Sequence, residues 1–179
     1  MDTLSFFTDV SCNPKYQLGF GAYLLVPDFD LNADQMELLK NKVKCKKFEF
    51  TSSTKLEIET LLWALKEVER INPKSELPGH LILYTDSQGM AGLPDRRAKL
   101  ERLNFKSIGK NRELNHAALY REFYRASDKW QFKVVKLKGH SKSITKDRSH
   151  TLFSYVDKES RKALKFYLKK NPLLNKQET

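Results

Sequence analysis

Four acidic side chains lie in sequence contexts where a carboxylate needs an explanation. Asp9 and Asp86 each close an apolar run, and Glu57 interrupts the apolar face of an amphipathic segment. Asp157 lies in a strongly basic segment near the C-terminus. If the fold gathers these groups, their charges cannot all persist without a neutralising cation. An all-oxygen site favours a hard ion such as Mg²⁺ or Mn²⁺, and two ions about 4 Å apart can drive phosphodiester hydrolysis.

The elements that must position Asp9 and Asp86 are strands. Both acids end runs that are rich in β-branched, aromatic and other apolar residues, and the second run is apolar enough for a central strand. If these two strands pair in parallel, their carboxyl ends meet at the edge where such sheets bind ligands. The sequence predicts strands over residues 4–12, 19–26, 45–51, 80–86 and 130–137.

Glu57 and Asp157 are expected on helices. The Ser52-Ser53-Thr54 segment offers N-cap chemistry for a helix that carries Glu57 on its inward face. Residues 152–168 have apolar side chains at helical spacing and basic side chains on the opposite face. Shorter helical patterns cover residues 33–40 and 115–129. Three strands followed by alternating helices and strands predict an α/β fold, a mixed sheet with helices on both faces.

The charge of the chain is unevenly distributed. The 179 residues carry a formal net charge of +11. Residues 1–94 hold 10 basic and 13 acidic side chains, whereas residues 95–179 hold 23 basic and 9 acidic ones. Such asymmetry indicates a polyanionic partner. Because no amphipathic helix with a large exposed apolar face is evident, nucleic acid is favoured over a membrane surface.

Composition and length exclude several classes of protein. An apolar fraction of 40% argues against disorder, and two cysteines are too few for a disulfide framework or a cysteine-rich zinc site. The sequence has neither the start of a secretory signal nor an apolar run of about 20 residues. We therefore expect a cytoplasmic, monomeric protein with no membrane association and a single domain over 1–179. Within it we expect a surface insertion at 27–42 and a flexible tail at 171–179.

At these acids the chain resembles ribonuclease H of type 1, which cuts the RNA strand of an RNA–DNA hybrid. The matching segments follow the family's order with compatible spacing and together cover the whole chain. They are residues 7–12 (FTDVSC), 51–57 (TSSTKLE), 84–88 (YTDSQ), 135–140 (VKLKGH) and 156–161 (VDKESR). The resemblance implies a ribonuclease H-like fold, a five-stranded mixed sheet of strand order 3-2-1-4-5 with helices on both faces.

The resemblance also assigns roles to the candidate catalytic residues. It implies two Mg²⁺ ions, with Mn²⁺ as the alternative, and products that end in 5′-phosphate and 3′-hydroxyl groups. It implies that His140 assists proton movement or product departure, which suits an imidazole that titrates near neutrality. The metal-binding carboxylates that it implies are Asp9, Glu57, Asp86 and Asp157.

Polar and basic residues are expected to contact the hybrid. Ser53 and Thr54 match minor-groove positions of the family, where ribose 2′-hydroxyls distinguish RNA from DNA. Residues 94–114 match a basic protrusion that grips the duplex in some members. The predicted substrate-binding residues are Cys12, Asn13, Ser53, Thr54, Gln88, Arg96, Arg97, Lys99 and Lys138.

Simpler roles are open to single members of this set. Thr54 lies three residues before Glu57, as in a capping box, and Asp86 could merely begin a helix. Asp157 could merely pair with Arg161 one helical turn later. The basic face of the last helix could be only a solvated surface.

Alternative assignments exist for two residues and for the function. Glu159 is the alternative to Asp157, and His150 is the alternative to His140. The favoured function is a divalent-metal-dependent endoribonuclease acting on RNA–DNA hybrids. The rivals are a DNA exonuclease or resolvase of the same fold and a non-catalytic hybrid-binding module.

Overall fold

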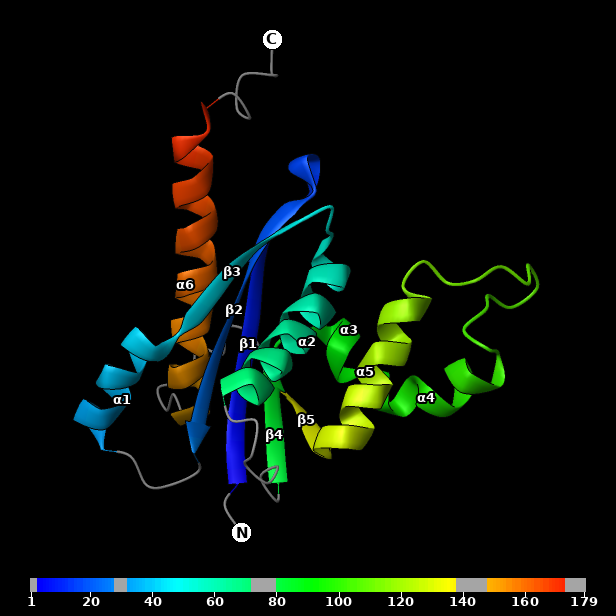
Figure 1. Cartoon of the computed structure of the whole chain (residues 1–179), viewed down its shortest axis with the longest axis horizontal. Helices are drawn as coiled ribbons and strands as arrows, with labels where there is room; N and C mark the ends of the chain where they lie inside the picture. The colour runs from blue at the N-terminus through cyan, green and yellow to red at the C-terminus, as the bar shows by residue number, and fades with distance from the viewer. Residues whose placement is uncertain (1–2, 28–31, 72–79, 138–147, 173–179) are drawn as a thin grey trace.

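The protein is built on a five-stranded mixed sheet. The computed structural model describes residues 3–27, 32–71, 80–137 and 148–172. Strand order is β3-β2-β1-β4-β5, as expected; β1 pairs antiparallel with β2 and parallel with β4 (Figure 1). The strands are β1 (Thr3–Asn13), β2 (Leu18–Pro27), β3 (Lys44–Glu49), β4 (His80–Thr85) and β5 (Phe132–Lys136).

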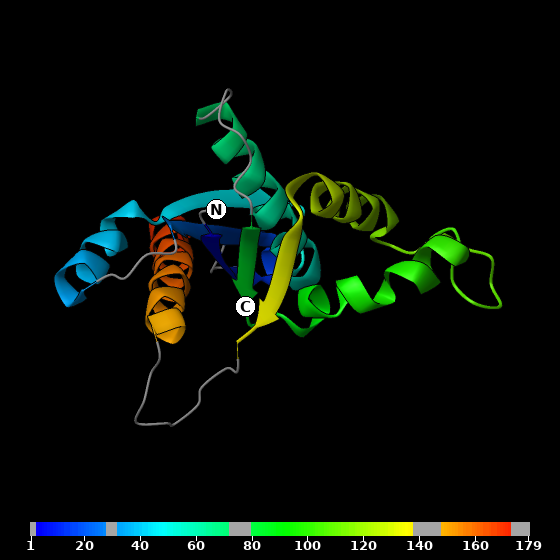
Figure 2. The ribbon, with the colours of Figure 1, turned by 90° about the horizontal axis from the view of Figure 1, so that it is seen from below.

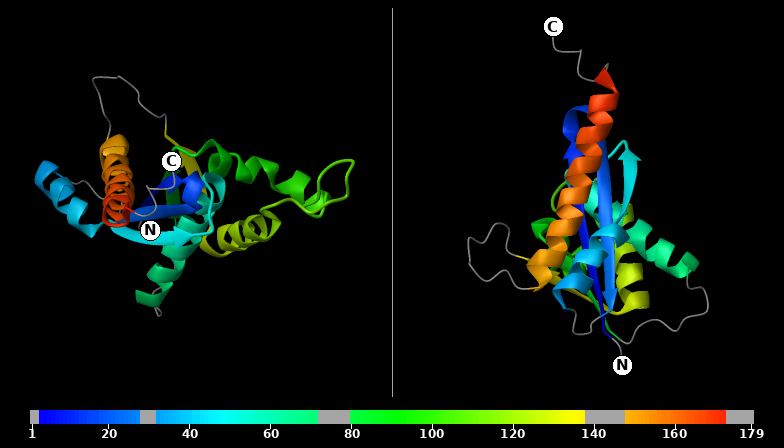
Figure 3. Two further views of the ribbon diagram at one scale, coloured as in Figure 1. Left: turned by 90° about the horizontal axis from the view of Figure 1, so that it is seen from above. Right: turned by 90° about the vertical axis from the view of Figure 1, so that its left-hand side faces the viewer.

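Helices cover both faces of this sheet. One face packs against α2, which α5 covers in turn, and the other packs against α6 (Figures 2 and 3). A short η1 turn (Pro14–Tyr16) joins β1 to β2, and η2 (Lys40–Lys42) precedes β3. The α-helices are α1 (Ala33–Leu39), α2 (Ser53–Ile71), α3 (Gln88–Ala91), α4 (Leu93–Arg102), α5 (Ala117–Trp130) and α6 (Arg148–Lys170).

Two hydrophobic cores form because successive strand residues point to opposite faces. Phe6 and Phe7, adjacent in β1, are both buried, one in each core. The first core lies between the sheet and α2 and α5, and it includes Leu83 and Phe123. The second lies between the sheet and α6, and it includes Val156. The helix bearing Asp157 is thereby fixed beside β1.

The segment at 27–42, predicted to be a surface insertion, contributes side chains to the second hydrophobic core. Its helix α1 begins with a capping box, in which Asn32 Oδ1 accepts from the Gln35 amide and Gln35 Oε1 accepts from the Asn32 amide. Leu39 is buried in the second core, and Met36 packs against the same core. The described part of this segment therefore extends the core beneath α6.

Two glycines in β2 set the position of α2. A Cβ atom at Gly21 would lie 1.9 Å from Thr60 Oγ1, and one at Gly19 would lie 2.4 Å from Leu56 Cδ2. Only residues without a side chain allow the first half of α2 to approach the sheet this closely. The same half of α2 carries Glu57, which is thereby brought toward β1.

Several predicted boundaries are wrong. The strand expected over 45–51 ends at Glu49, because Phe50 adopts a left-handed conformation with φ of 53°. Trp130 was expected to begin a strand, but it is the last residue of α5, and β5 begins at Phe132. Gln131 separates them in a left-handed conformation with φ of 49°, which glycine or asparagine would have signalled more clearly. The last helix starts at Arg148, before the predicted residue 152. Across the described residues, no helix has the length and apolar character needed to span a membrane.

Candidate active site

Asp9 and Asp86 are brought to the same level by the β1–β4 ladder. Phe7 lies opposite Tyr84 at the last parallel pair, and each acid follows its partner of this pair by two residues. Asp9 belongs to β1, whereas Asp86 follows β4 directly, at the start of the turn into α3. The two acids therefore lie just beyond the last parallel pair, as expected for neighbours, although Asp9 is four residues before the end of β1 and not at its carboxyl end.

Glu57 and Asp157 reach this point from opposite faces of the sheet. Glu57 lies on α2 and Asp157 on α6. Burial raises the pKa of both Asp9 and Glu57. The charges of Asp86 and Asp157 raise that of Asp9 further, and those of Asp9 and Asp86 raise that of Glu57 further. The four carboxylates, hereafter the acid site, are therefore close enough to interact. Asp9 is central because it interacts with each of the other three.

Asp9 is the most constrained of the four acids. Its residue is only 6% exposed, and burial, together with the Asp86 and Asp157 charges, raises its pKa from 3.8 to about 7. The fully buried Ser160 donates from Oγ to Asp9 Oδ2 over 3.1 Å, which favours the ionised form. Ser160 was not among the residues predicted from the sequence; its spacing of three residues from Asp157 was the available signal.

Glu57 has no role in capping its helix. The Ser52 hydroxyl instead accepts from the Lys55 amide over 3.4 Å, near the start of α2. Burial and the neighbouring charges of Asp9 and Asp86 raise the pKa of Glu57 from 4.5 to about 8. Its Oε2 atom is buried without a hydrogen-bond partner. A buried carboxylate oxygen without a donor is costly unless a cation or a proton satisfies it.

Asp157 has two interactions, and Glu159 lies elsewhere. Asp157 Oδ1 pairs with Arg161 Nε at 2.7 Å, so the helical ion pair does form. Asp157 nevertheless acts on the Asp9 carboxyl. The charge of Glu159 acts instead on Cys45, whose pKa burial raises to about 11. Of the two alternatives, the structure brings Asp157, and not Glu159, to the acid site.

The chemistry of the acid site fits a hard divalent cation. Its donors are all carboxylate oxygens, which suit Mg²⁺ or Mn²⁺, and one of them lacks any partner. Among the described residues, no three acidic, histidine or cysteine side chains are gathered tightly enough to hold a metal ion as they stand. A bound ion would therefore have to draw the carboxylates closer together than they lie in this structure.

His140 and Lys138 lie outside the described residues. Leu137, the last described residue before them, donates its amide to Thr85 O over 2.8 Å, next to Asp86. The chain therefore leaves the described region beside the acid site. His150, the alternative histidine, lies in the first turn of α6 and is half-buried.

The predicted substrate-side residues of the N-terminal half lie on two neighbouring turns. Cys12 at the end of β1 interacts with the hydroxyl of Ser53 at the start of α2. Asn13 Oδ1 accepts from the Lys15 and Tyr16 amides and so fixes the β1–β2 turn. Ser53 and its neighbour Thr54 are exposed.

Gln88 lies on the other side of the acid site. It is the first residue of α3, after the Ser87 hydroxyl that caps this helix. Gln88 is exposed, and its Oε1 accepts from Lys136 Nζ of β5. Gln88, a predicted substrate contact, is therefore hydrogen-bonded to Lys136, which was not among the residues predicted from the sequence.

The basic protrusion, residues 94–114, extends away from the sheet beside α5 (Figure 1). Arg97 already has partners of opposite charge. Its guanidinium forms a bidentate pair with Asp128 of α5 and donates from Nε to Glu101 Oε1 over 2.8 Å. Arg96 and Lys99 are exposed, and neither has an ion-pair partner among the described residues. The Arg96 guanidinium lies 5.7 Å from the centroid of the Tyr120 ring.

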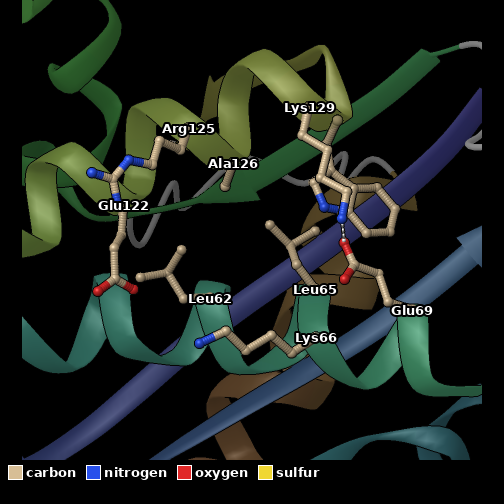
Figure 4. Close-up of a pocket in the computed structure, with 9 residues that line it drawn as sticks. Leu62, Leu65, Lys66, Glu69, Glu122, Arg125, Ala126 and Lys129 are labelled. Carbon is tan, nitrogen blue, oxygen red and sulfur yellow. Dashed lines mark ion pairs between the residues drawn. The ribbon is translucent and has the colours of Figure 1, made fainter.

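A separate groove of about 210 Å³ lies between α2 and α5 (Figure 4). Its floor is apolar, with Leu62 and Leu65, and its rim is charged. One end is bridged by the ion pair between Lys129 Nζ and Glu69 Oε1 at 2.6 Å. No member of the acid site lines it, so it is distinct from the candidate active site.

Comparison with solved structures identifies the fold. LC9-RNase H1, described as a type 1 RNase H with the type 2 active-site motif, matches with a TM-score of 0.63 and 12% identity, over 90% of this chain and 71% of that one. The foamy viral protease-reverse transcriptase in complex with dsDNA matches with a TM-score of 0.57 and 12% identity, over 90% of this chain and 94% of that one. No family model and no curated protein matches the sequence.

Proposed function

Starting from a ribonuclease H-like fold with four carboxylates gathered at one site, we propose that the protein is a divalent-metal-dependent endoribonuclease that cuts the RNA strand of RNA–DNA hybrids. The observation that carries the proposal is that Asp9 is buried beside other carboxylates, while the Oε2 atom of the half-buried Glu57 is itself buried without a hydrogen-bond partner. Such an arrangement costs folding free energy unless the site binds a cation. The cost is explained if the acid site exists to hold metal.

The chain's own residues have distinct tasks in this reaction. Asp9, Glu57, Asp86 and Asp157 would hold Mg²⁺ or Mn²⁺, two ions when substrate is bound. When bound, these ions supply an activated water and stabilise the leaving oxygen. Ser160 fixes the carboxylate of Asp9 by its hydrogen bond, and Arg161 restrains that of Asp157. His140 would carry a proton to or from the site as the products, with 5′-phosphate and 3′-hydroxyl ends, depart.

Several features support nucleic acid as the substrate. The C-terminal half of the chain holds the positive charge, and Arg96 and Lys99 lie exposed on the protrusion. The foamy viral structure of the same fold contains double-stranded DNA. The preference for a hybrid rests on the sequence resemblance to ribonuclease H of type 1. As expected from the sequence, we propose that the protein acts as a monomer in the cytoplasm.

A substrate panel tests this function. RNA-labelled hybrid, double-stranded RNA, double-stranded DNA and single strands are incubated with the protein in Mg²⁺, in Mn²⁺ and without a divalent ion. We expect cleavage of the RNA strand of the hybrid alone, and only with a divalent ion. Cleavage of DNA would instead favour an exonuclease or resolvase. Binding of the hybrid without cleavage in either ion would favour a non-catalytic module.

A further inference from the structure

Phe50 is an exposed aromatic residue that folding does not explain. It is 79% exposed, and no other large apolar side chain among the described residues is more so. It lies between β3 and α2, where the chain turns toward the acid site. Its ring has no aromatic or cationic partner among the described residues. An isolated exposed ring of this size adds nothing to either hydrophobic core.

The backbone of Phe50 is held in a strained conformation. Its φ of 53° lies in the left-handed region, which bulky side chains rarely adopt. Three hydrogen bonds fix it there: Lys55 Nζ donates to Phe50 O over 2.7 Å, and the Thr51 amide and hydroxyl donate to Gln17 O and Glu59 Oε2, each over 2.9 Å. The surrounding turns therefore fix the backbone position from which the ring projects into solvent.

The strained turn is continuous with the predicted substrate-binding residues. The bond from the Thr51 amide to Gln17 O joins it to the β1–β2 turn, which Asn13 fixes. Ser53, three residues after Phe50, interacts with Cys12 across the same junction. We call these two turns, residues 13–17 and 50–53, the turn surface. It presents amide and hydroxyl groups and two aromatic rings, the half-buried Tyr16 and the exposed Phe50, beside the helix that carries Glu57.

We propose that Phe50 is a nucleic-acid contact that enters the minor groove of the bound hybrid and packs against its sugars. The proposal rests on the proposed function, which puts the hybrid across the turn surface and the acid site. Sugar faces are the apolar part of a minor groove, and exposed apolar side chains are used there by other proteins. Because the backbone of Phe50 is already fixed, binding costs mainly the freedom of two side-chain torsions, which makes the ring an efficient contact.

The test replaces the ring without disturbing the turn. Asparagine tolerates the left-handed region, so Phe50→Asn should fold at least as stably as the wild type. We expect its affinity for a labelled hybrid, measured by fluorescence anisotropy without divalent ions, to fall about tenfold. In Mg²⁺, KM should rise while kcat stays unchanged. The slope of log affinity against log salt should also stay unchanged, because no charge is removed.

Matched controls separate the possible outcomes. Phe166→Asn removes another exposed ring, 58% exposed on α6, and should leave hybrid affinity unchanged. Phe50→Gly relieves the backbone strain and should lose affinity as Phe50→Asn does. Equal affinity of the wild type and both Phe50 variants would overturn this inference and leave the proposed function intact. A wild type that does not bind the hybrid would overturn both. A loss of affinity that follows a loss of stability would show a structural role instead.

Discussion

The acid site and the basic protrusion use charge in opposite ways. At the acid site, Asp9 is buried and Glu57 is half-buried beside other carboxylates, and their pKa values are raised to about 7 and about 8. In the protrusion, Arg97 is balanced by Asp128 and Glu101. The first arrangement destabilises the metal-free fold, whereas the second links α4 to α5.

This difference shows which charges remain for ligands. A charged side chain that is already paired with an opposite charge must break that pair to bind a phosphate. An exposed pair of this kind contributes only about 0–1 kcal/mol to the stability of the fold. The excess of basic residues in the C-terminal half therefore overstates the number available for phosphates. Arg96 and Lys99, which have no ion-pair partner among the described residues, are better candidates than Arg97.

Neutralising one central acid should have the largest effect. Asp9→Asn or Asp86→Asn should lower the rate of hybrid cleavage by about 10³-fold or more, because the carboxylates that hold the metal ions are incomplete. Hybrid affinity should persist, since the groups that bind phosphate are untouched. Single-turnover cleavage and anisotropy measure the two effects separately. A near wild-type rate in either variant contradicts the assignment of the site.

The same substitution should stabilise the metal-free protein as pH rises. Because the pKa of Asp9 is raised in the fold, the unfolded chain ionises first, and the wild type loses stability between about pH 4 and pH 7. Asparagine does not titrate, so Asp9→Asn should become more stable than the wild type by about 2–4 kcal/mol above pH 7. Urea unfolding in EDTA measures this difference. It should vanish near pH 4; a difference independent of pH would disprove the ionisation argument.

His140→Ala should slow cleavage less than loss of an acid does. Removing a group that assists proton movement should lower kcat by about tenfold to a hundredfold, without abolishing turnover. His150→Ala is the matched variant, since His150 lies in the first turn of α6. Pre-steady-state and steady-state rates distinguish slower chemistry from slower product release. An unchanged rate in His140→Ala with a reduced rate in His150→Ala would transfer the role to His150.

Substitutions of basic residues in the protrusion should have the smallest effects. Loss of Arg96 or Lys99 should change hybrid binding, whereas loss of Arg97 should change stability. Arg96→Ala and Lys99→Ala should each reduce the slope of log affinity against log salt by about 0.9 for each phosphate that is no longer neutralised. Arg97→Ala should leave the slope unchanged and lower the free energy of unfolding by about 0.5–1 kcal/mol. Anisotropy titrations at several salt concentrations and urea unfolding measure these quantities. If Arg97→Ala alone reduced the slope of log affinity against log salt, Arg97 and not Arg96 or Lys99 would be the phosphate contact.

Local pattern predicted the individual elements, because apolar runs at Asp9 and before Asp86 form strands and the inward stripe with Glu57 forms a helix. The strand order and the grouping of the four acids depend on how these elements pack, and they were expected from the resemblance to ribonuclease H of type 1 rather than from local pattern. The end of α5 was misplaced because Gln131 adopts a left-handed conformation that its residue type does not announce.

Interactions between distant segments could not be predicted. The hydrogen bond from Ser160 to Asp9 joins residues 151 positions apart, and the Arg97–Asp128 pair joins two helices. Neither has a local signature, because each depends on how the elements pack. The strained conformation of Phe50 is also invisible in the sequence, since it depends on hydrogen bonds from Thr51 to Gln17 and from Lys55.

Metal-dependent cleavage tests the central claim most directly. The wild-type protein is mixed with a hybrid labelled on its RNA strand, first in EDTA, then with Mg²⁺ in excess, and then with EDTA restored. We predict no cleavage at the first stage, RNA fragments with 5′-phosphate ends at the second, and arrest at the third. Cleavage that continues in EDTA, or a bound hybrid that stays intact in both Mg²⁺ and Mn²⁺, would contradict the account.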